Sequence, residues 1–369
     1  MKTAIIRVGR SLLNVVYSLF GALPTKNRIV FMSRQSDHPS YDIKALVSFC
    51  EDRDVETKIL CRKMKPGAAG ALAYGCHVLT QLYYMATSKV VVLDSYCIAA
   101  CLAKHRDSVK VVQMWHALGA MKKFSRSILD MKEGHSSRLA NAMGMHENYD
   151  FIFTSSEASR PAFAEAFGYS PEKLTIMSLP RVDALLDGQR DESVKQQIRE
   201  VYPQLADKET ILYAPTLRKN FDMTEAAEKF IEAVDFDRFN LVIKMHPLTE
   251  GSIDTGRAIV DRKFSTMDMF CACDYVVTDY SAITYEAALK GLPLFFYDFD
   301  IDEYEGERSF YLDYKAEMPG FMSRNASDII RAIEEGKYDK GRIKAFADKY
   351  IEKQKGCTEE IGNLLIKQL

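Results

Sequence analysis

Two histidines follow apolar runs that are typical of buried strands. His116 stands in Gln-Met-Trp-His-Ala-Leu-Gly-Ala-Met-Lys-Lys-Phe, and His246 stands in Ile-Lys-Met-His-Pro. Ligands of open α/β sheets bind at the carboxyl ends of the strands, so we expect both imidazoles at such an edge. Because imidazole titrates near neutral pH, His116 is a candidate general base for a hydroxyl group. The alternative for each histidine is a structural role.

The neighbours of His116 offer one aromatic and two cationic side chains. Trp115 precedes it, and Lys122 and Lys123 follow after a turn of small residues. We assign these three residues to the acceptor side of a site. The remaining histidines lack such a setting, and we interpret them as surface or packing residues.

A second set of residues suits a nucleotide diphosphate. The segment Thr-Asp-Tyr-Ser-Ala-Ile-Thr-Tyr-Glu, residues 278–286, follows a predicted strand and opens a predicted helix, with Ser281 as the expected N-cap. Free amides at a helix N-terminus favour phosphate, and threonine and serine hydroxyls add donors. An ordinary capped helix is the alternative, and Glu286 is either a ribose ligand or a surface residue. The donor-side candidates are Thr216, Arg218, Lys244, His246, Thr278, Asp279, Tyr280, Ser281 and Glu286.

Two neighbouring strand ends strengthen the diphosphate interpretation. Tyr-Ala-Pro-Thr-Leu-Arg ends at Arg218, which can grip phosphate oxygens with two parallel hydrogen bonds. Lys244 adds a point charge, and His246 can donate a hydrogen bond to a bridging or leaving oxygen. His116 and His246 are therefore the two candidate catalytic residues.

Composition and missing motifs exclude several classes of protein. The net charge is -2 and there is no basic stripe with interleaved aromatic residues, which argues against nucleic acid as a partner. Neither a P-loop nor Gly-x-Gly-x-x-Gly occurs, which argues against a P-loop kinase and a dinucleotide dehydrogenase. The 8 cysteines are scattered, without paired zinc spacing, so we expect structural thiols in a reducing cytosol, no metal and no cofactor.

The elements that position these residues alternate as in βαβ units, which predicts an α/β protein with largely parallel sheets. The predicted strands are 28–33, 56–61, 89–93, 109–114, 151–154 and 174–177, and then 210–213, 241–244, 275–278 and 294–296. A charged stretch at 187–200 separates two Rossmann-like halves that we expect to face each other across a cleft. The expected domains are residues 24–186 for the acceptor and 187–350 for the donor. The tail is predicted as two helices, the last of which, within 351–369, packs back on the first domain.

The first segment, residues 1–23, predicts an amphipathic helix. Lys2, Arg7 and Arg10 accompany a mostly apolar run that is too short and too polar to span a membrane. We expect such a helix to lie at a membrane interface. A helix packed on the protein's own core and a signal peptide are the alternatives.

Taken in order, the Trp-His, Pro-Thr-x-Arg, Lys-x-His-Pro and Thr-Asp-Tyr-Ser motifs resemble those of the CDP-glycerol glycerophosphotransferase family of teichoic-acid biosynthesis. This resemblance implies a GT-B fold and transfer of a polyol phosphate from CDP-glycerol or CDP-ribitol to a lipid-linked saccharide. It further implies a peripheral location at the cytoplasmic face of the cell membrane. His116 would be the base, while His246, Arg218, Thr278 and Ser281 would hold the donor diphosphate.

One departure from the family pattern concerns the acceptor side. Trp115-His116-Ala117 stands where many polymerising members carry Trp-His-Gly, and the following Leu-Gly-Ala resembles the priming enzymes. We therefore expect a CDP-glycerol glycerophosphotransferase that primes a polymer. The alternatives are a CDP-ribitol transferase, a GT-B glycosyltransferase and a membrane-bound sensor of nucleotide or lipid. The oligomeric state stays open, with a homo-oligomer among the options.

Overall fold

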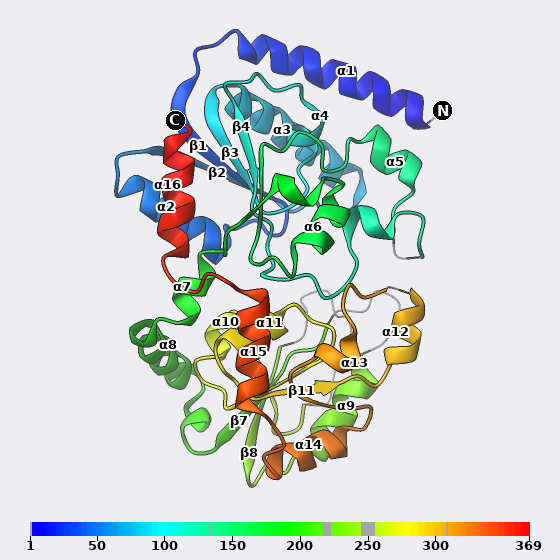
Figure 1. The fold of residues 1–369 in the computed structure, drawn as a ribbon, viewed down its shortest axis with the longest axis vertical. Coiled ribbons are helices and arrows are strands. Elements are labelled where there is room, and N and C mark those ends of the chain that lie inside the picture. The colour runs from blue at the N-terminus through cyan, green and yellow to red at the C-terminus, as the bar shows by residue number, and fades with distance from the viewer. Residues whose placement is uncertain (1, 133, 217–222, 245–254, 308) are drawn as a thin grey trace. The chain divides into compact units, whose positions relative to one another are not determined.

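The computed structural model describes residues 2–132, 134–216, 223–244, 255–307 and 309–369. The chain divides into two compact units (Figure 1). Unit 1 comprises Met1–Asp183 and Glu352–Leu369, and unit 2 comprises Ala184–Ile351. Each unit is built on one six-stranded sheet in which all recorded pairings are parallel.

The sheet of unit 1 has the strand order β2-β1-β3-β4-β5-β6. Its central strands are runs of β-branched and aliphatic residues, such as Val90, Val91 and Val92 in β3, that are fully buried. Continuous apolar runs are typical of strands covered on both faces by helices. The strands are β1 (Lys26–Ser33), β2 (Glu56–Cys61), β3 (Ser88–Leu93), β4 (Lys110–Gln113), β5 (Phe151–Thr154) and β6 (Leu174–Ile176).

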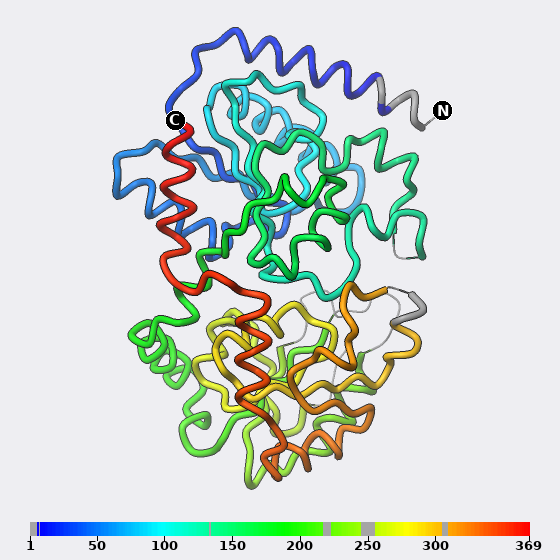
Figure 2. The backbone as a smooth tube through the Cα atoms, in the orientation of Figure 1, coloured from blue at the N-terminus to red at the C-terminus, as the bar shows by residue number. Residues whose placement is uncertain are grey.

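Helices of this unit pack around the sheet and on one another. Helix α1 contacts α3, α4 and α5, and α16 lies beside α2 although the two are far apart in the sequence (Figure 2). The helices are α1 (Lys2–Gly21), α2 (Tyr41–Glu51), α3 (Gly67–Ala86), α4 (Ile98–Leu102), α5 (Ser137–Ala142), α6 (Arg160–Phe167) and α16 (Cys357–Lys367). In the described part of the chain, no helix is both long and apolar enough to cross a membrane.

Polar contacts fix α1 to the unit. Asn14 donates to the Leu102 carbonyl at 3.0 Å and accepts from the Lys104 amide at 2.8 Å. The Arg106 guanidinium donates to the carbonyl of Gly21 at the end of α1, at 2.6 Å. The helix therefore has one packed face, and its other face carries exposed Val8, Leu12, Val15 and Leu19.

The sheet of unit 2 has the strand order β12-β11-β10-β7-β8-β9. One side of it buries a core in which the Tyr213 and Phe230 rings stack at 4.5 Å and Phe239, Phe295 and Ile329 are at most 1% exposed. The strands are β7 (Glu209–Tyr213), β8 (Phe239–Ile243), β9 (Ile259–Val260), β10 (Tyr275–Thr278), β11 (Leu294–Tyr297) and β12 (Phe321–Ser323). The helices are α8 (Gly188–Val201), α9 (Thr224–Ala233), α10 (Thr266–Met269), α11 (Ile283–Leu289), α12 (Ile301–Glu307), α13 (Tyr314–Glu317), α14 (Ala326–Glu334) and α15 (Lys340–Tyr350), with α7 (Arg181–Leu185) at the join of the units.

Every strand predicted from the sequence is present to within two residues at each end. Two short strands, β9 and β12, were not predicted from the sequence.

The predicted two-helix tail is wrong, since the structure has α14, α15 and α16 there. Gly336 and Gly356, with φ of 64° and 70°, adopt the left-handed backbone that lets one helix end and another begin.

Candidate functional site

Polar residues gather where the strands of unit 1 end. Asp94 directly follows β3, His116 follows β4 after two residues, and Ser33 ends β1. Parallel strands bring these residues to one edge of the sheet, as the sequence pattern predicts for His116.

The His116 ring is half-buried and its orientation is fixed by the backbone of the neighbouring strand end. Its Nδ1 lies 2.7 Å from the Asp94 carbonyl oxygen. Because a carbonyl only accepts hydrogen bonds, Nδ1 must carry the proton, and Nε2 is then the ring nitrogen that accepts hydrogen bonds or a proton. The Gln35 amide nitrogen lies 3.3 Å from Nδ1 and 3.5 Å from Nε2.

Burial lowers the pKa of His116 to about 4. The hydrogen bond to the Asp94 carbonyl and the Asp42 carboxylate oppose this effect, and the Arg181 guanidinium adds to it. The imidazole is therefore neutral at physiological pH, the state in which it can accept a proton.

The backbone of Trp115 is strained. Its φ of 61° lies in the left-handed region, which bulky residues rarely adopt. The Trp115 amide donates to the Gln113 side chain at 2.9 Å, and the indole stacks on Phe124 with ring centroids 5.2 Å apart. These contacts hold the turn that presents His116, whose ring centroid is 4.2 Å from that of Trp115.

The two lysines assigned to the acceptor side are half-buried, and both have partners. Lys123 pairs with Glu165 at 3.7 Å. A phenylalanine-rich cluster that includes Phe163 and Phe167 packs beside this segment. His146 also contacts Phe167, so its interpretation as a packing residue is confirmed.

A buried ion pair adjoins His116. Asp42, in the first turn of α2, accepts from the Arg181 amide at 2.8 Å and from its Nε at 2.9 Å. Neither this pair nor Asp94 was predicted from the sequence. The signal for Asp94 was present, because it follows a predicted strand in the same way as His116 does.

In unit 2, the candidates of the Thr-Asp-Tyr-Ser segment mainly tie strands together. The Thr278 hydroxyl donates to the Ala214 carbonyl at 2.7 Å, and both Asp279 carboxylate oxygens accept from the Thr216 amide, at 2.9 and 3.0 Å. Tyr280 is fully buried, with its hydroxyl 3.2 Å from Asp300. These contacts bring the ends of β7 and β10 together.

The expectation that Ser281 is the N-cap of the following helix is wrong. Helix α11 begins at Ile283 with Ala282 as its capping residue, and the Ser281 hydroxyl accepts from the Ile283 amide only at 3.5 Å. A tight turn before the helix shifts its start by one residue. Glu286 is 9% exposed, which is not the surface setting that was the alternative.

Lys244 is held inside unit 2. Its ammonium pairs with Asp261 Oδ2 at 2.8 Å and donates to the Asp261 and Phe264 carbonyls. Burial raises the pKa of Asp261, but hydrogen bonds from Lys244 and the Lys263 amide bring it below its usual range. The hydrogen-bond donors of the Lys244 ammonium are thus satisfied within the protein. Arg218 and His246 lie outside the described residues.

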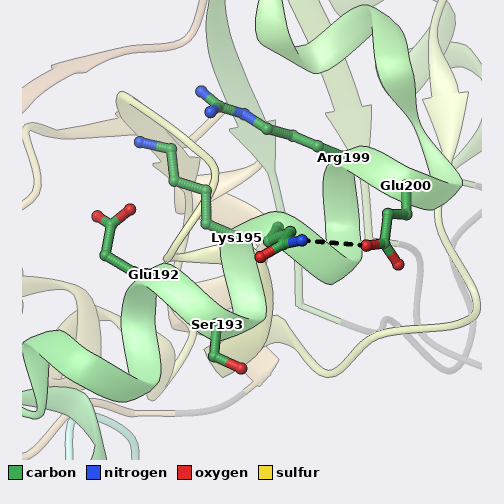
Figure 3. Close-up of a pocket in the computed structure, with 6 residues that line it drawn as sticks. Glu192, Ser193, Lys195, Arg199 and Glu200 are labelled. Atoms are coloured by element: carbon green, nitrogen blue, oxygen red, sulfur yellow. Dashed lines mark hydrogen bonds between the residues drawn. The ribbon is translucent and has the colours of Figure 1, made fainter.

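Two surface recesses lie apart from all of these candidates. One runs along α8 and is lined by charged side chains such as Glu192, Lys195 and Arg199 (Figure 3). The other lies at the start of α14, beside Lys229 and Arg324. Over the described ranges, no cluster of three histidine, cysteine or carboxylate side chains could hold a metal ion.

Two parallel α/β units of this kind define a GT-B-like fold, and solved structures share it. The wall teichoic acid polymerase TagF superposes with a TM-score of 0.77 at 19% identity, covering 99% of this chain and 96% of that one. The Staphylococcus aureus MnaA–UDP complex gives 0.59 at 15% identity, covering 92% and 95%. At these identities the likeness shows the fold alone.

The family model described as CDP-Glycerol:Poly(glycerophosphate) glycerophosphotransferase matches residues 15–367, and the chain belongs to this family. It is accordingly a phosphotransferase of the group that handles glycerol or ribitol phosphate in teichoic acid synthesis.

Relatives in this family include primases and polymerases. The teichoic acid ribitol-phosphate primase of Bacillus spizizenii is 30% identical, over 98% of this chain and 96% of the relative. The glycerol-phosphate primase of Bacillus subtilis is 25% identical, over 78% and 75%. The poly(ribitol-phosphate) polymerase of Bacillus spizizenii is 29% identical, over 96% of this chain but 58% of the relative.

Proposed function

We propose that this protein transfers a polyol phosphate from a CDP-polyol to a hydroxyl of a lipid-linked saccharide, and that it adds a priming unit. The observation that carries the proposal is the state of His116. Its ring is neutral, its Nδ1 proton is held by the Asp94 carbonyl, and Nε2, which carries no proton, faces the Gln35 amide and can accept a proton. This is the arrangement that a general base for a hydroxyl nucleophile requires.

The proposed reaction is a single displacement. His116 Nε2 takes the proton of the acceptor hydroxyl, and that oxygen forms a bond to the β-phosphorus of the CDP-polyol. The bond from this phosphorus to the bridging oxygen breaks, and CMP leaves with the electron pair. Negative charge spreads over the phosphoryl oxygens in the transition state, where fixed donors stabilise it.

We assign the donor to the carboxyl edge of the sheet of unit 2. The tie between Asp279 and the Thr216 amide fixes the chain just before Arg218, which we propose grips the diphosphate together with His246. Because Lys244 already pairs with Asp261, we propose for it a supporting role in shaping the strand end.

The polyol is ribitol or glycerol. The motifs of the sequence predict CDP-glycerol, whereas the 30% identity to a ribitol-phosphate primase over nearly the whole of both chains favours CDP-ribitol. That relative is a primase, which supports a priming role. We therefore propose CDP-ribitol as the first donor to test and CDP-glycerol as the alternative.

We also propose that the protein works as a peripheral protein at the cytoplasmic face of the membrane. The outer face of α1 exposes Val8, Leu12, Val15 and Leu19, and its sequence contains no acidic residue. An apolar stripe in a helix whose charged residues are all basic suits an interface with anionic lipid. A lipid-linked acceptor would be reached from this position.

The direct test is CMP release by the purified protein from each CDP-polyol, with and without a lipid-linked disaccharide acceptor. We expect CMP that depends on the acceptor and a product with a new phosphodiester. A glycosidic product from a nucleotide sugar would support a glycosyltransferase instead. Failure of all donors with a folded protein and a verified acceptor would contradict the proposal and favour a sensor of nucleotide or lipid.

A further inference from the structure

Asp94 has a buried carboxyl group whose two oxygens form no well-defined hydrogen bond in the described part of the chain. Its side chain is 1% exposed, and among the residues that the structure describes neither of its carboxyl oxygens has a hydrogen-bond partner. Buried carboxyl groups normally have hydrogen-bond partners, and an exception often marks a functional site. The hydroxyls of Ser33 and Ser95 adjoin the group and, as weak hydrogen-bond donors, favour its charged form.

The backbone of Asp94 links this carboxyl to His116. The Asp94 carbonyl accepts the Nδ1 proton of His116 at 2.7 Å. Covalent geometry therefore keeps the carboxyl within roughly 9 Å of the imidazole. Over such a distance inside a protein, two charges interact appreciably.

Within the described residues, no basic side chain forms an ion pair with the Asp94 carboxyl. Arg181 is already neutralised by Asp42, with which it makes several hydrogen bonds. The Cys61 thiol, which also faces Asp94, stays neutral because burial raises its pKa to about 11. The buried Cys97 thiol has a raised pKa as well, and Arg34, which faces that thiol, donates to the Tyr96 carbonyl. A hydrogen bond to a neutral carbonyl leaves the charge of Arg34 in place, so an ionised Asp94 is the second carboxylate of a cluster that also holds two guanidinium groups.

We propose that Asp94 is a positioning residue for the base: its backbone carbonyl selects the tautomer of His116, and its carboxylate supplies the negative charge against which the imidazolium forms. The inference rests on the proposed function for His116. In the step concerned, the acceptor O–H bond breaks and an Nε2–H bond forms, while Asp94 stays ionised. No other group has to change its protonation state.

Protonation of Asp94 should then control activity in mildly acidic solution. Burial raises the pKa of Asp94 to about 6, Asp42 adds to the rise, and the serine hydroxyls and Arg181 oppose it. Below about pH 6 the carboxyl becomes neutral and its support for the imidazolium is lost. His116 itself, with a pKa of about 4, is still unprotonated in that range.

The kinetic test is the pH profile of CMP release for the wild type and Asp94→Asn. We expect Asp94→Asn to lower kcat about fivefold to tenfold at neutral pH, with KM for the CDP donor unchanged. We also expect the wild-type loss of activity below pH 6 to be absent in this variant. A variant that keeps both the wild-type rate and the decline near pH 6 would overturn the proposal.

Folding stability gives a test that needs no substrate. Because the pKa of Asp94 is raised on folding, its ionised form costs stability above pH 6, and the cost disappears as the pH falls toward 3.8. Asp94→Asn should raise the ratio of folded to unfolded protein about tenfold at pH 7.5 and less at pH 5. Asp42→Asn, which leaves the Arg181 guanidinium without its carboxylate partner, should lower this ratio of folded to unfolded protein.

Exposed Asp107 provides the matched control, since Asp107→Asn should change neither stability nor the pH profile. If Asp94→Asn lowered stability equally at both pH values, Asp94 would be a structural hydrogen-bonding group and the proposal would fail. If the stability result held but the wild type released no CMP, the proposed function would fail while the unpaired charge of Asp94 stood.

Discussion

At the scale of single residues, the chemistry of His116 depends on what its neighbours do to its protonation. The Asp94 carbonyl fixes the proton on Nδ1, burial keeps the ring neutral, and the preceding residue, Trp115, has a strained backbone with φ of 61°. A base built in this way relies on backbone geometry.

We predict that His116→Ala lowers acceptor-dependent CMP release by about 10²-fold to 10⁴-fold, the usual contribution of a general base. The measurement is kcat under saturating donor. Exposed His135 serves as the control, because His135→Ala removes an imidazole from the surface of the same unit. Comparable activity in the two variants would exclude His116 as the base.

At the scale of elements, the C-terminal helix α16 packs closely on α2 within unit 1. A Cβ added at Gly362 in α16 would lie 2.2 Å from the Phe49 ring of α2. The Asp183 carboxylate accepts from the Cys357 and Thr358 amides at 3.0 and 2.8 Å, and so caps α16. A distant residue thus satisfies a helix start whose own N-cap, Gly356, has no side chain.

We predict that Gly362→Ala lowers the free energy of unfolding by about 1–3 kcal/mol, because the added methyl group overpacks the contact with Phe49. The control is Gly75→Ala in α3, where nothing lies within 4 Å of the new Cβ. There, the higher helix propensity of alanine should raise stability by about 0.5–1 kcal/mol. Chemical denaturation measures both, and equal signs would contradict the packing argument.

At the scale of the whole molecule, the exposed face of α1 is joined by exposed side chains of α3, namely Leu72, Leu79 and Tyr83. Helices α1 and α3 pack together, and α3 contains no charged residue. Single exposed apolar residues are ordinary, whereas α1 exposes four of them at helical spacing along one face.

We predict that Leu12→Gln combined with Leu19→Gln lowers co-sedimentation with anionic liposomes several-fold, while activity on a soluble acceptor stays unchanged. Leu186→Gln, at an exposed leucine outside α1 and α3, is the control. If the double variant bound liposomes as the wild type does, α1 would be a packing helix only.

The sequence by itself determined the α/β class, the predicted strands and the position of His116 at a strand end. These features are local, because hydrophobic periodicity and the polar residue after a strand are set by neighbours in the chain. The same local signal placed Thr278 and Asp279 after β10 but could not show that their side chains tie β10 to β7.

Only the tertiary structure decided which polar groups are already satisfied and which are not. The pairing of Lys244 with Asp261, and of Arg181 with Asp42 at a sequence distance of 139 residues, depends on folding. So does the unpaired state of Asp94, since burial and hydrogen bonding are properties of the packed chain. The protonation states of Asp94 and His116 follow from this packing, and no pattern of residue types in one sequence encodes them.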